Sequence, residues 1–251
     1  MLHNSLVQRD VSVVLVPSSG REAALGGRTA IVIDVFRATT TILAALSQGA
    51  MCIKPVTSRE EALALRRSGQ VSLAGGESDA IKMEGFDAGN SPLEYTQERV
   101  RNASVAFVTT NGTKAILFAA GGASQVLLGC MNNRRAVAAK AAATGRSVTI
   151  VCSGRKGNFS LDDTLCAGLI AQVLCEDFGY APIEDSCHAA LALCSNGEGE
   201  VMKLVREGRS FQRLTELKMQ KDLDFALRLD TNEGVPFYDP RAREVRLAEK
   251  G

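Results

Sequence analysis

Ala-Ile-Val-Ile-Asp-Val-Phe-Arg-Ala-Thr-Thr-Thr, at residues 30–41, is the stretch that decides the fold of this chain. Its first half, residues 30–35, is a short run rich in β-branched residues, which is typical of a strand buried on both faces. Residues 39–48 follow with helical spacing and stop before Gly49, which indicates a helix. Because a buried strand passes directly into a helix here, we predict β-α-β units and a parallel sheet.

The same alternation continues on both sides of this stretch. Further strands are predicted at residues 11–16, 51–56, 71–73, 104–109, 125–128 and 147–152, and further helices at residues 58–68, 113–120 and 133–143. Ser58 and Glu61 have the spacing of a capping box at the start of one helix. After residue 160 we find helical patterns but no convincing strand. These helices are predicted at residues 161–178, 185–194, 199–207 and 217–229.

The pattern predicts an α/β fold with three layers, in which a mainly parallel or mixed sheet lies between two layers of helices. We expect the helix-rich C-terminal region, about residues 160–251, to pack on that sheet. No linker, repeat or low-complexity segment divides the chain, so residues 1–251 are predicted to form a single domain.

The composition excludes several classes of partner. The net charge is +1, aromatic residues make up 5% and Trp is absent, so we expect neither a nucleic acid nor a membrane as partner. No apolar run approaches a membrane span, and the N-terminus lacks the layout of a signal peptide. The seven cysteines contain no C-x-x-C pair. A cytoplasmic protein with reduced thiols is therefore expected. We also expect a homo-oligomer, in which the C-terminal helices provide either core or subunit interface.

Several well-known catalytic motifs are absent. The sequence has no P-loop, no dinucleotide-binding G-x-G-x-x-G after a strand, and no G-x-S-x-G elbow. With two histidines, a zinc site or a Ser-His-Asp triad has little support. No cysteine is followed by five residues and then Arg. Phe36 stands two residues after Asp34, where a two-aspartate phosphatase pattern would need its second acid.

The first informative polar segment follows the strand at residues 30–35. Asp34 can ligate a hard cation, and the planar guanidinium of Arg37 can bind phosphate. Thr39 and Thr40 lie at a helix start, where hydroxyls and backbone N–H groups can hold phosphate oxygens. The alternative is that Asp34 and Thr39 only cap the helix and that Arg37 makes a surface ion pair.

The second segment is a long loop rich in glycine, asparagine and proline. Gly75-Gly76-Glu77 begins it, and Glu77 is a second candidate cation ligand. Lys82 and the run G-F-D-A-G-N-S-P at residues 85–92 follow, which contains Asp87, Asn90 and Ser91. The alternative is an ordinary connection, but its roughly twenty residues exceed a typical loop of this kind and favour a functional role.

The third and fourth segments also follow predicted strands. The third, at residues 109–114, offers Asn111, Gly112, Thr113 and Lys114 at a helix start as an anion cradle, or else as a simple N-cap. The fourth, at residues 152–163, begins with Cys152-Ser153-Gly154-Arg155-Lys156 and ends with Asp162 and Asp163. In that segment the two acids either interact favourably with the dipole of the following helix, or Asp163 points inward as a third cation ligand. Arg155 and Lys156 are interpreted as solvated charges.

In an open α/β sheet, ligands gather beyond the carboxyl ends of strands. We therefore expect these segments to converge on one site for Mg²⁺ and a small phosphorylated compound. The predicted metal ligands are Asp34, Glu77 and Asp163. The predicted phosphate-binding residues are Arg37, Thr39, Thr40, Asn111, Gly112, Thr113, Lys114 and Ser153. Asp34 and Asp87 are the candidates for a nucleophile if the reaction is covalent, and attack by water remains open.

At these residues the chain resembles the 2-phosphosulfolactate phosphatase family. The matching segments are D-V-F-R-A-T-T-T at 34–41, G-F-D-A-G-N-S-P at 85–92, T-T-N-G-T at 109–113 and F-S-L-D-D-T-L-C-A-G at 159–168. The resemblance implies an α/β, Mg²⁺-dependent phosphatase that hydrolyses 2-phospho-3-sulfolactate to 3-sulfolactate and phosphate, a step of coenzyme M biosynthesis. Lys82, Asn90 and Ser91 would then meet the carboxylate or sulfonate of the substrate.

Two alternatives remain beside this hypothesis. The resemblance leads us to expect a base close to Gly76-Glu77, where this chain has Ser78-Asp79-Ala80. A phosphatase that acts on another small phosphorylated hydroxy acid or sugar is therefore the second hypothesis. The third is a non-catalytic protein that binds a phosphorylated metabolite.

Overall fold

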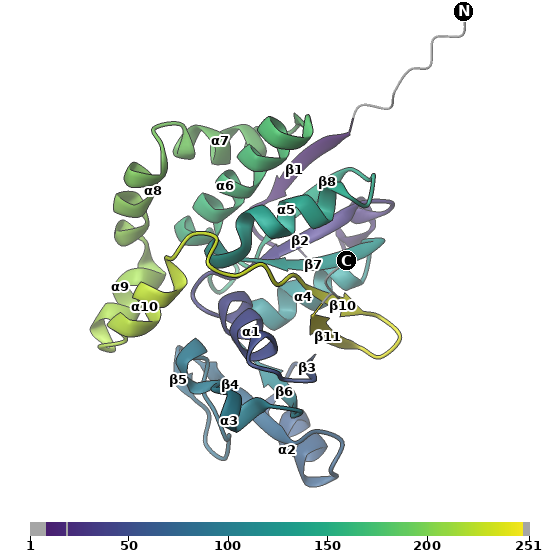
Figure 1. Cartoon of the computed structure of the whole chain (residues 1–251), viewed down its shortest axis with the longest axis vertical. Coiled ribbons are helices and arrows are strands. Elements are labelled where there is room, and N and C mark those ends of the chain that lie inside the picture. Colours follow the sequence, from purple (N-terminus) through teal and green to yellow (C-terminus); the bar gives the residue numbers. More distant parts are fainter. Residues whose placement is uncertain (1–8, 19, 248–251) are drawn as a thin grey trace, which may run out of the picture.

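The sheet consists of two blocks of parallel strands that an antiparallel hairpin joins (Figure 1). The computed structural model describes residues 9–18 and 20–247. The first block has the order β7-β2-β8-β1-β9, and the second has β3-β6-β4, with β5 antiparallel on its edge. The strands are β1 (Asp10–Val14), β2 (Thr29–Ile33), β3 (Cys52–Pro55), β4 (Leu73–Ser78), β5 (Ile81–Lys82), β6 (Ser104–Val108), β7 (Gln125–Gly129), β8 (Val148–Cys152), β9 (Ala181–Pro182), β10 (Pro236–Asp239) and β11 (Glu244–Leu247).

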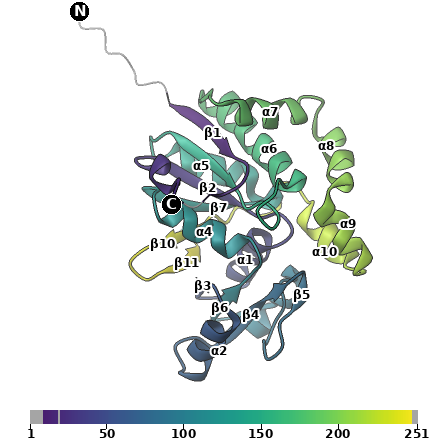
Figure 2. The same cartoon turned by 180° about the vertical axis from the view of Figure 1, so that it is seen from behind.

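Helices cover both faces of the sheet, as the sequence predicts. The helices are α1 (Ala38–Ser47), α2 (Arg59–Arg67), α3 (Gln97–Val100), α4 (Gly112–Ala120), α5 (Arg134–Ala142), α6 (Leu161–Phe178), α7 (Asp185–Cys194), α8 (Glu198–Leu204), α9 (Arg209–Glu216) and α10 (Gln220–Ala226). In the first block, alternate strand residues face opposite ways. Ile31 and Ile33 pack in a core with α5, α6 and α7, whereas Ala30 and Val32 pack in a second core with α1 and α4. Figure 2 shows α4 on the face turned away in Figure 1.

Local sequence signals explain several of these boundaries. The Ser58 hydroxyl accepts a hydrogen bond from the Glu61 N–H at 3.1 Å, which caps α2 as predicted. Helix α6 ends at Gly179, whose φ of 68° is the left-handed conformation that glycine adopts without strain. Within the described residues, no helix is both long and apolar enough to cross a membrane.

The C-terminal region differs from the prediction. No strand was expected after residue 160, yet β10 and β11 form a hairpin that pairs with β7 on one side and with β3 on the other. Each of these strands has only four residues, which is too short to give a clear alternating pattern. The predicted helix at residues 217–229 is α10 alone, and α9 was not predicted.

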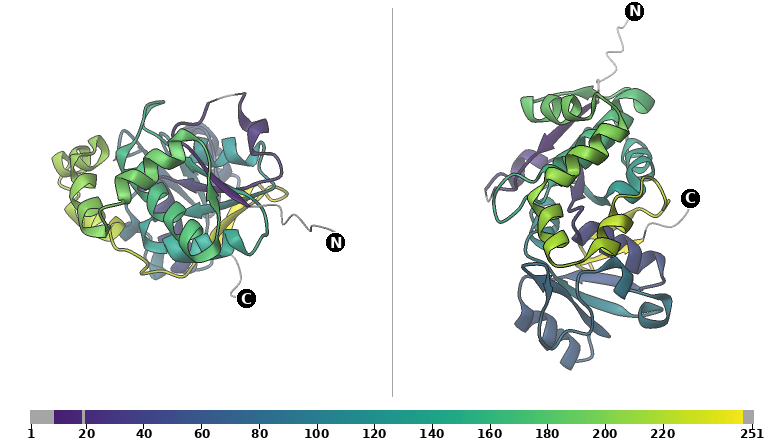
Figure 3. Two further views of the ribbon diagram at one scale, coloured as in Figure 1. Left: turned by 90° about the horizontal axis from the view of Figure 1, so that it is seen from above. Right: turned by 90° about the vertical axis from the view of Figure 1, so that its left-hand side faces the viewer.

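Helices α8, α9 and α10 form an arm along one side of the molecule. The arm begins after α7 and extends toward the second block (Figure 3). Phe211, Leu214 and Leu223 form a small apolar cluster in it, against Phe36 at the end of β2 and Ala80 in the β4–β5 turn. The arm therefore touches the segments that follow strands of both blocks.

Val245 tests the role of the hairpin. Its side chain is fully buried and its residue pairs with Ile53 of β3. We expect Val245→Ala to lower the free energy of unfolding by about 2 kcal/mol, because it removes buried apolar area where the hairpin meets the second block. Urea denaturation measures this loss. Met51→Ala, at a side chain that is 61% exposed, is the matched control. Equal effects of the two substitutions would show that the hairpin contributes little.

Candidate active site

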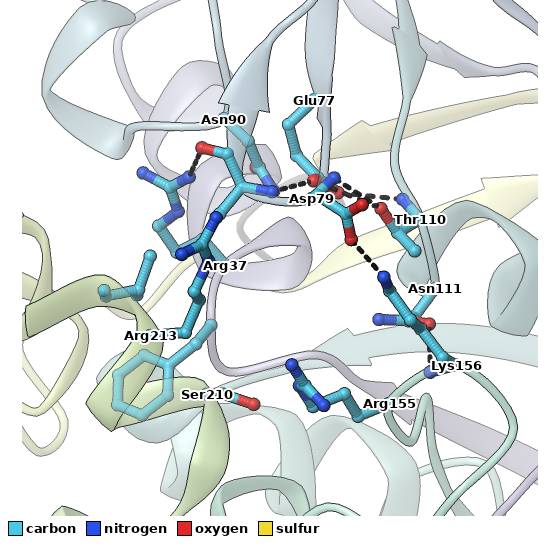
Figure 4. Close-up of a pocket in the computed structure, with 13 residues that line it drawn as sticks. Arg37, Glu77, Asp79, Asn90, Thr110, Asn111, Arg155, Lys156, Ser210 and Arg213 are labelled. Atoms are coloured by element: carbon cyan, nitrogen blue, oxygen red, sulfur yellow. Dashed lines mark hydrogen bonds and ion pairs between the residues drawn. The ribbon is translucent and has the colours of Figure 1, made fainter. Parts of the chain in front are cut away.

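A pocket lies where segments from both blocks meet (Figure 4). Its lining comes from the segments after β2, β6 and β8, from β4 with its turn, and from α9. Its volume of about 70 Å³ exceeds the space that one water molecule needs. Four residues predicted from the sequence line it, namely Arg37, Glu77, Asn90 and Asn111.

The strand ends meet in a way that the sequence did not reveal. The antiparallel hairpin makes the two parallel blocks run in opposite directions along the sheet. Segments after β2 and β8 of the first block and residues of β4 and after β6 of the second nevertheless line the same pocket. The pocket therefore lies between the blocks and not along one straight edge.

A layer of buried carboxyl groups lies behind the lining of the pocket, near Glu77, and we call this layer the floor; none of its three members lines the pocket itself. Asp34 directly follows β2, and Asp162 and Asp163 lie in the first turn of α6; all three are buried. Burial, together with the charges of Glu77 and Asp162, raises the pKa of Asp34 to about 7, and the hydrogen bond from the N–H of Ala38 opposes the shift. Burial also raises the pKa of Asp162. The pKa of Asp163 is raised by burial first and then by the charges of Asp162 and Asp34.

The pH dependence of stability follows from these carboxyl groups. Between about pH 4 and about pH 7 the unfolded chain releases protons that the folded protein retains, so the free energy of unfolding falls as pH rises. In EDTA we expect the wild-type melting temperature to be several degrees lower at about pH 8 than at about pH 5. Asp34→Asn should reduce this difference, because it removes one of the three groups. An unchanged difference would contradict the raised pKa of Asp34.

Glu77 joins the turn after β4 to the loop after β6. One of its carboxylate oxygens accepts a hydrogen bond from the Thr110 N–H at 2.8 Å. The other accepts from the Ala80 N–H at 2.6 Å and from the Thr110 hydroxyl at 3.2 Å. Glu77 lies inside β4, whereas the sequence suggested that a loop begins at Gly75. The carboxylate is 6% exposed and adds negative charge to the pocket.

The three predicted metal ligands do not form a preassembled cage. Within residues 9–18 and 20–247, no three Asp, Glu, His or Cys side chains are arranged to hold one metal ion. Asp163 already uses both carboxylate oxygens, because one accepts from the Val35 N–H at 3.0 Å and the other from the Ser153 hydroxyl at 3.0 Å and the Gly154 N–H at 3.1 Å. Through these hydrogen bonds Asp163 connects the start of α6 to the segments that follow β2 and β8.

The remaining oxygen atoms suit a hard divalent cation. Among the described residues, Asn90 Oδ1 is a buried side-chain oxygen without a hydrogen-bond partner, and Asn90 lines the pocket beside Glu77. A buried polar atom of this kind needs a donor or a cation. Mg²⁺ is typically held by one or two carboxylates and takes its other ligands from water and substrate phosphate. Asp34 and Asn90 Oδ1 fit that pattern, and Glu77, which lines the pocket, would use lone pairs that its three hydrogen bonds leave available.

Arg37 is engaged by the protein itself. Its side chain is 3% exposed and forms an ion pair with Asp222 of α10. It also donates a hydrogen bond to the Ala80 carbonyl at 2.9 Å. Asp222 in turn accepts a hydrogen bond from the Ser91 hydroxyl at 2.7 Å. Arg37 therefore joins the arm to the β4–β5 turn, and phosphate would have to compete with a buried carboxylate for it.

The predicted threonines bond to the backbone that precedes their own helices. The Thr39 hydroxyl donates to the Asp34 carbonyl and the Thr40 hydroxyl to the Val35 carbonyl, both at 2.9 Å. The Thr113 hydroxyl donates to the Thr109 carbonyl at 3.2 Å. The capping alternative holds for Asp34, which accepts from the Ala38 N–H at 3.2 Å, and not for these threonines.

The other predicted residues lie around the pocket or away from it. Ser153 and Gly112 lie under the floor, and a Cβ atom added at Gly112 would approach Asp34 Oδ2 to 2.6 Å. Lys82 and Ser91 line a neighbouring cavity that shares Arg37 and Asn90 with the pocket, and Lys114 lines another that shares Asn111. Asp87 lies apart from these groups, because its carboxylate binds Arg66 at 2.6 Å and the Ala74 N–H at 2.8 Å.

Sequence reasoning missed several residues of the site. Arg155 and Lys156 were interpreted as solvated charges, but both line the pocket. Asp222, Ser210 and Arg213 come from the arm; the pattern indicated a helix around Asp222 but none at α9, and no motif marks either segment. Asp162 was visible as an acid in the first helical turn, and its burial is what separates it from a surface charge.

Comparison with known proteins shows the family of the chain. A probable 2-phosphosulfolactate phosphatase of Symbiobacterium thermophilum is 40% identical over 216 residues, which cover 85% of this chain and 92% of the relative. A protein of the same description from Clostridium acetobutylicum is 33% identical over 229 residues, which cover 91% and 97%. Residues 14–241 match the family described as 2-phosphosulpholactate phosphatase. The chain therefore belongs to the 2-phosphosulpholactate phosphatase family.

Proposed function

We propose that this protein hydrolyses the phosphate ester of 2-phospho-3-sulfolactate and releases 3-sulfolactate and phosphate. The observation that carries the proposal is a pocket with buried carboxylates at its floor and cationic side chains around it, in a chain of this family. Such an arrangement suits a metal-bound phosphate together with further anionic groups. The reaction would serve coenzyme M biosynthesis or a related route to sulfonates.

Asp34, Glu77 and Asn90 Oδ1 would hold Mg²⁺ in this proposal. The ion would screen the phosphate charge and stabilise the negative charge that develops during hydrolysis. The residues of the chain orient the ester around it. Asn111 holds the loop after β8 in place, because its side-chain oxygen accepts a hydrogen bond from the Lys156 N–H at 2.8 Å. The arm closes one side of the pocket through Ser210, Arg213 and Leu214.

Two routes of attack are compatible with the floor. Either water attacks phosphorus directly, or the Asp34 carboxylate attacks first and water then hydrolyses the aspartyl phosphate. Both break the bond between phosphorus and the ester oxygen, which leaves as the hydroxyl of sulfolactate. The stereochemistry at phosphorus separates them, and it is measured by hydrolysis in ¹⁷O-labelled water of an ester whose thiophosphate group is made chiral by ¹⁸O. Direct attack by water inverts the configuration at phosphorus, whereas the two successive displacements of the covalent route retain it.

The activity itself is tested with purified protein and a panel of phosphate esters. We expect phosphate release from 2-phospho-3-sulfolactate with MgCl₂ and none in EDTA. Release only from other hydroxy-acid or sugar phosphates would show that the protein is a phosphatase with a different substrate. No release from any ester, together with thermal stabilisation by 2-phospho-3-sulfolactate, would indicate a binding protein without catalysis.

A further inference from the structure

The charges of the pocket are separated between its floor and its rim. Glu77 provides negative charge in the lining, with Asp34 buried near it behind the lining, and Arg155, Lys156 and Arg213 provide positive charge at the rim. Figure 4 shows the side chains of Arg155 and Arg213 entering the pocket from the loop after β8 and from α9. Because phosphate bound through a metal ion occupies the floor, the rim cations have no role in the chemistry described so far.

The rim arginines are weakly engaged by the protein. Within the described residues, the half-buried side chain of Arg155 forms no ion pair and no hydrogen bond. Arg213 pairs with Glu216 on its own helix at 3.3 Å, and the Glu216 side chain is 67% exposed. Exposed pairs of this kind contribute little, about 0–1 kcal/mol. Both guanidinium groups are therefore available to a ligand.

A carboxylate of the protein already lies among these cations. Asp79, in the β4–β5 turn, forms an ion pair with Lys156. That contact lowers the pKa of Asp79, and the charges of Arg213 and Arg155 lower it further. All three rim cations therefore act on one carboxylate, so the rim has the charge and spacing to take a small anion.

We propose that Arg155 and Arg213 form a second anion subsite, which takes the sulfonate or carboxylate of the substrate while its phosphate lies at the floor. Asp79 competes with that anion for the same cations. A planar guanidinium can donate two parallel hydrogen bonds to a sulfonate or carboxylate, and partial burial strengthens them. The subsite rests on the proposed function, because it explains how a compound with three acidic groups is distinguished from a simple phosphate ester.

Binding of 3-sulfolactate tests the subsite without any need for turnover. By isothermal titration calorimetry with MgCl₂ present, we expect Arg155→Gln and Arg213→Gln each to raise the dissociation constant roughly 10- to 100-fold, because each removes charge-assisted hydrogen bonds. Asp79→Asn should lower it several-fold, because the competing charge is gone. Arg209→Gln, at an exposed position of the same helix, is the matched control and should leave it unchanged.

The direction of these effects separates recognition from damage to the fold. A disrupted pocket binds more weakly, so tighter binding by Asp79→Asn cannot come from misfolding. Titration with lactate, which has only the carboxylate, and with 2-hydroxyethanesulfonate, which has only the sulfonate, shows which group depends on the two arginines. Unchanged affinity for 3-sulfolactate in both arginine variants, or no binding by the wild type, would overturn the subsite.

Phosphate release measured on the same samples keeps the two proposals apart. If the wild type binds 3-sulfolactate through Arg155 and Arg213 but hydrolyses no ester, the subsite stands and the proposed reaction falls. If 2-phospho-3-sulfolactate is hydrolysed with the same KM by the wild type and both arginine variants, the reaction stands and the subsite falls.

Discussion

Asp34→Asn should lower the kcat for phosphate release from 2-phospho-3-sulfolactate by roughly 1,000-fold or more. The amide keeps the shape of the side chain but removes the negative charge at the floor, where cation binding supplies several kcal/mol of transition-state stabilisation. It also removes the nucleophile of the covalent route. We expect the substitution to lower activity without lowering the thermal stability of the protein. In EDTA at about pH 8 we expect the variant to melt at or above the wild-type temperature, because burial of the ionised carboxylate is unfavourable.

Asp87→Asn is the matched control for this prediction. Asp87 was the second candidate nucleophile, but its carboxylate is held by Arg66 and the Ala74 N–H, whereas the charge of Glu77 in the pocket lining acts on Asp34. The variant should therefore keep kcat within a few-fold of the wild type. If Asp87→Asn lost activity and Asp34→Asn retained it, Asp87 and not Asp34 would be the carboxylate that the reaction needs.

Asp222→Ala should lower the free energy of unfolding by roughly 3–5 kcal/mol. The substitution leaves the Arg37 guanidinium buried without its carboxylate, which is the costly way to break a buried ion pair. It also deprives the Ser91 hydroxyl of its acceptor. Urea denaturation followed by circular dichroism measures the loss, and the slope against urea shows whether the arm alone or the whole domain unfolds.

A double substitution decides what the Arg37–Asp222 pair contributes. Arg37→Met combined with Asp222→Leu replaces both charges by apolar groups of similar size, so it should recover most of the stability lost in Asp222→Ala. A loss of less than about 1 kcal/mol in Asp222→Ala would mean that Arg37 is only weakly held by the arm. Arg37 would then be free for phosphate, as the sequence predicted.

Most of the fold could be predicted because its elements are locally encoded. The strand at residues 30–35 and the helices at residues 161–178 and 185–194 appear in the structure with nearly the expected bounds. The hairpin at residues 236–247 could not be predicted in this way. Its strands are short and its partners, β7 and β3, are more than a hundred residues earlier in the chain. The reversal of the two parallel blocks depends on that pairing.

The site shows the same limit. The segments that border the pocket were predictable from their place after strands, and Glu77, Asn90 and Asn111 line it. What each side chain contacts was not predictable. Thr39 and Thr40 have the same sequence context whether they bind phosphate or bond to the protein backbone, and in the structure their hydroxyls donate to the Asp34 and Val35 carbonyls. The partner of Arg37 lies 185 residues away, in a helix without a motif.

The position of the hairpin also orders the events of folding. Asp34 belongs to the first block and Glu77 to the second, and among the described strands the two blocks are paired through residues 236–247. Helices α1 and α4 pack in one core with Val32 of the first block and Ile53 of the second, so this shared core can begin to form before the hairpin is synthesised. Closing the sheet then requires contacts between segments far apart in the chain, which is the slow kind of step. We therefore expect the strand pairing between the blocks, and with it the final form of the pocket, to be completed late in folding.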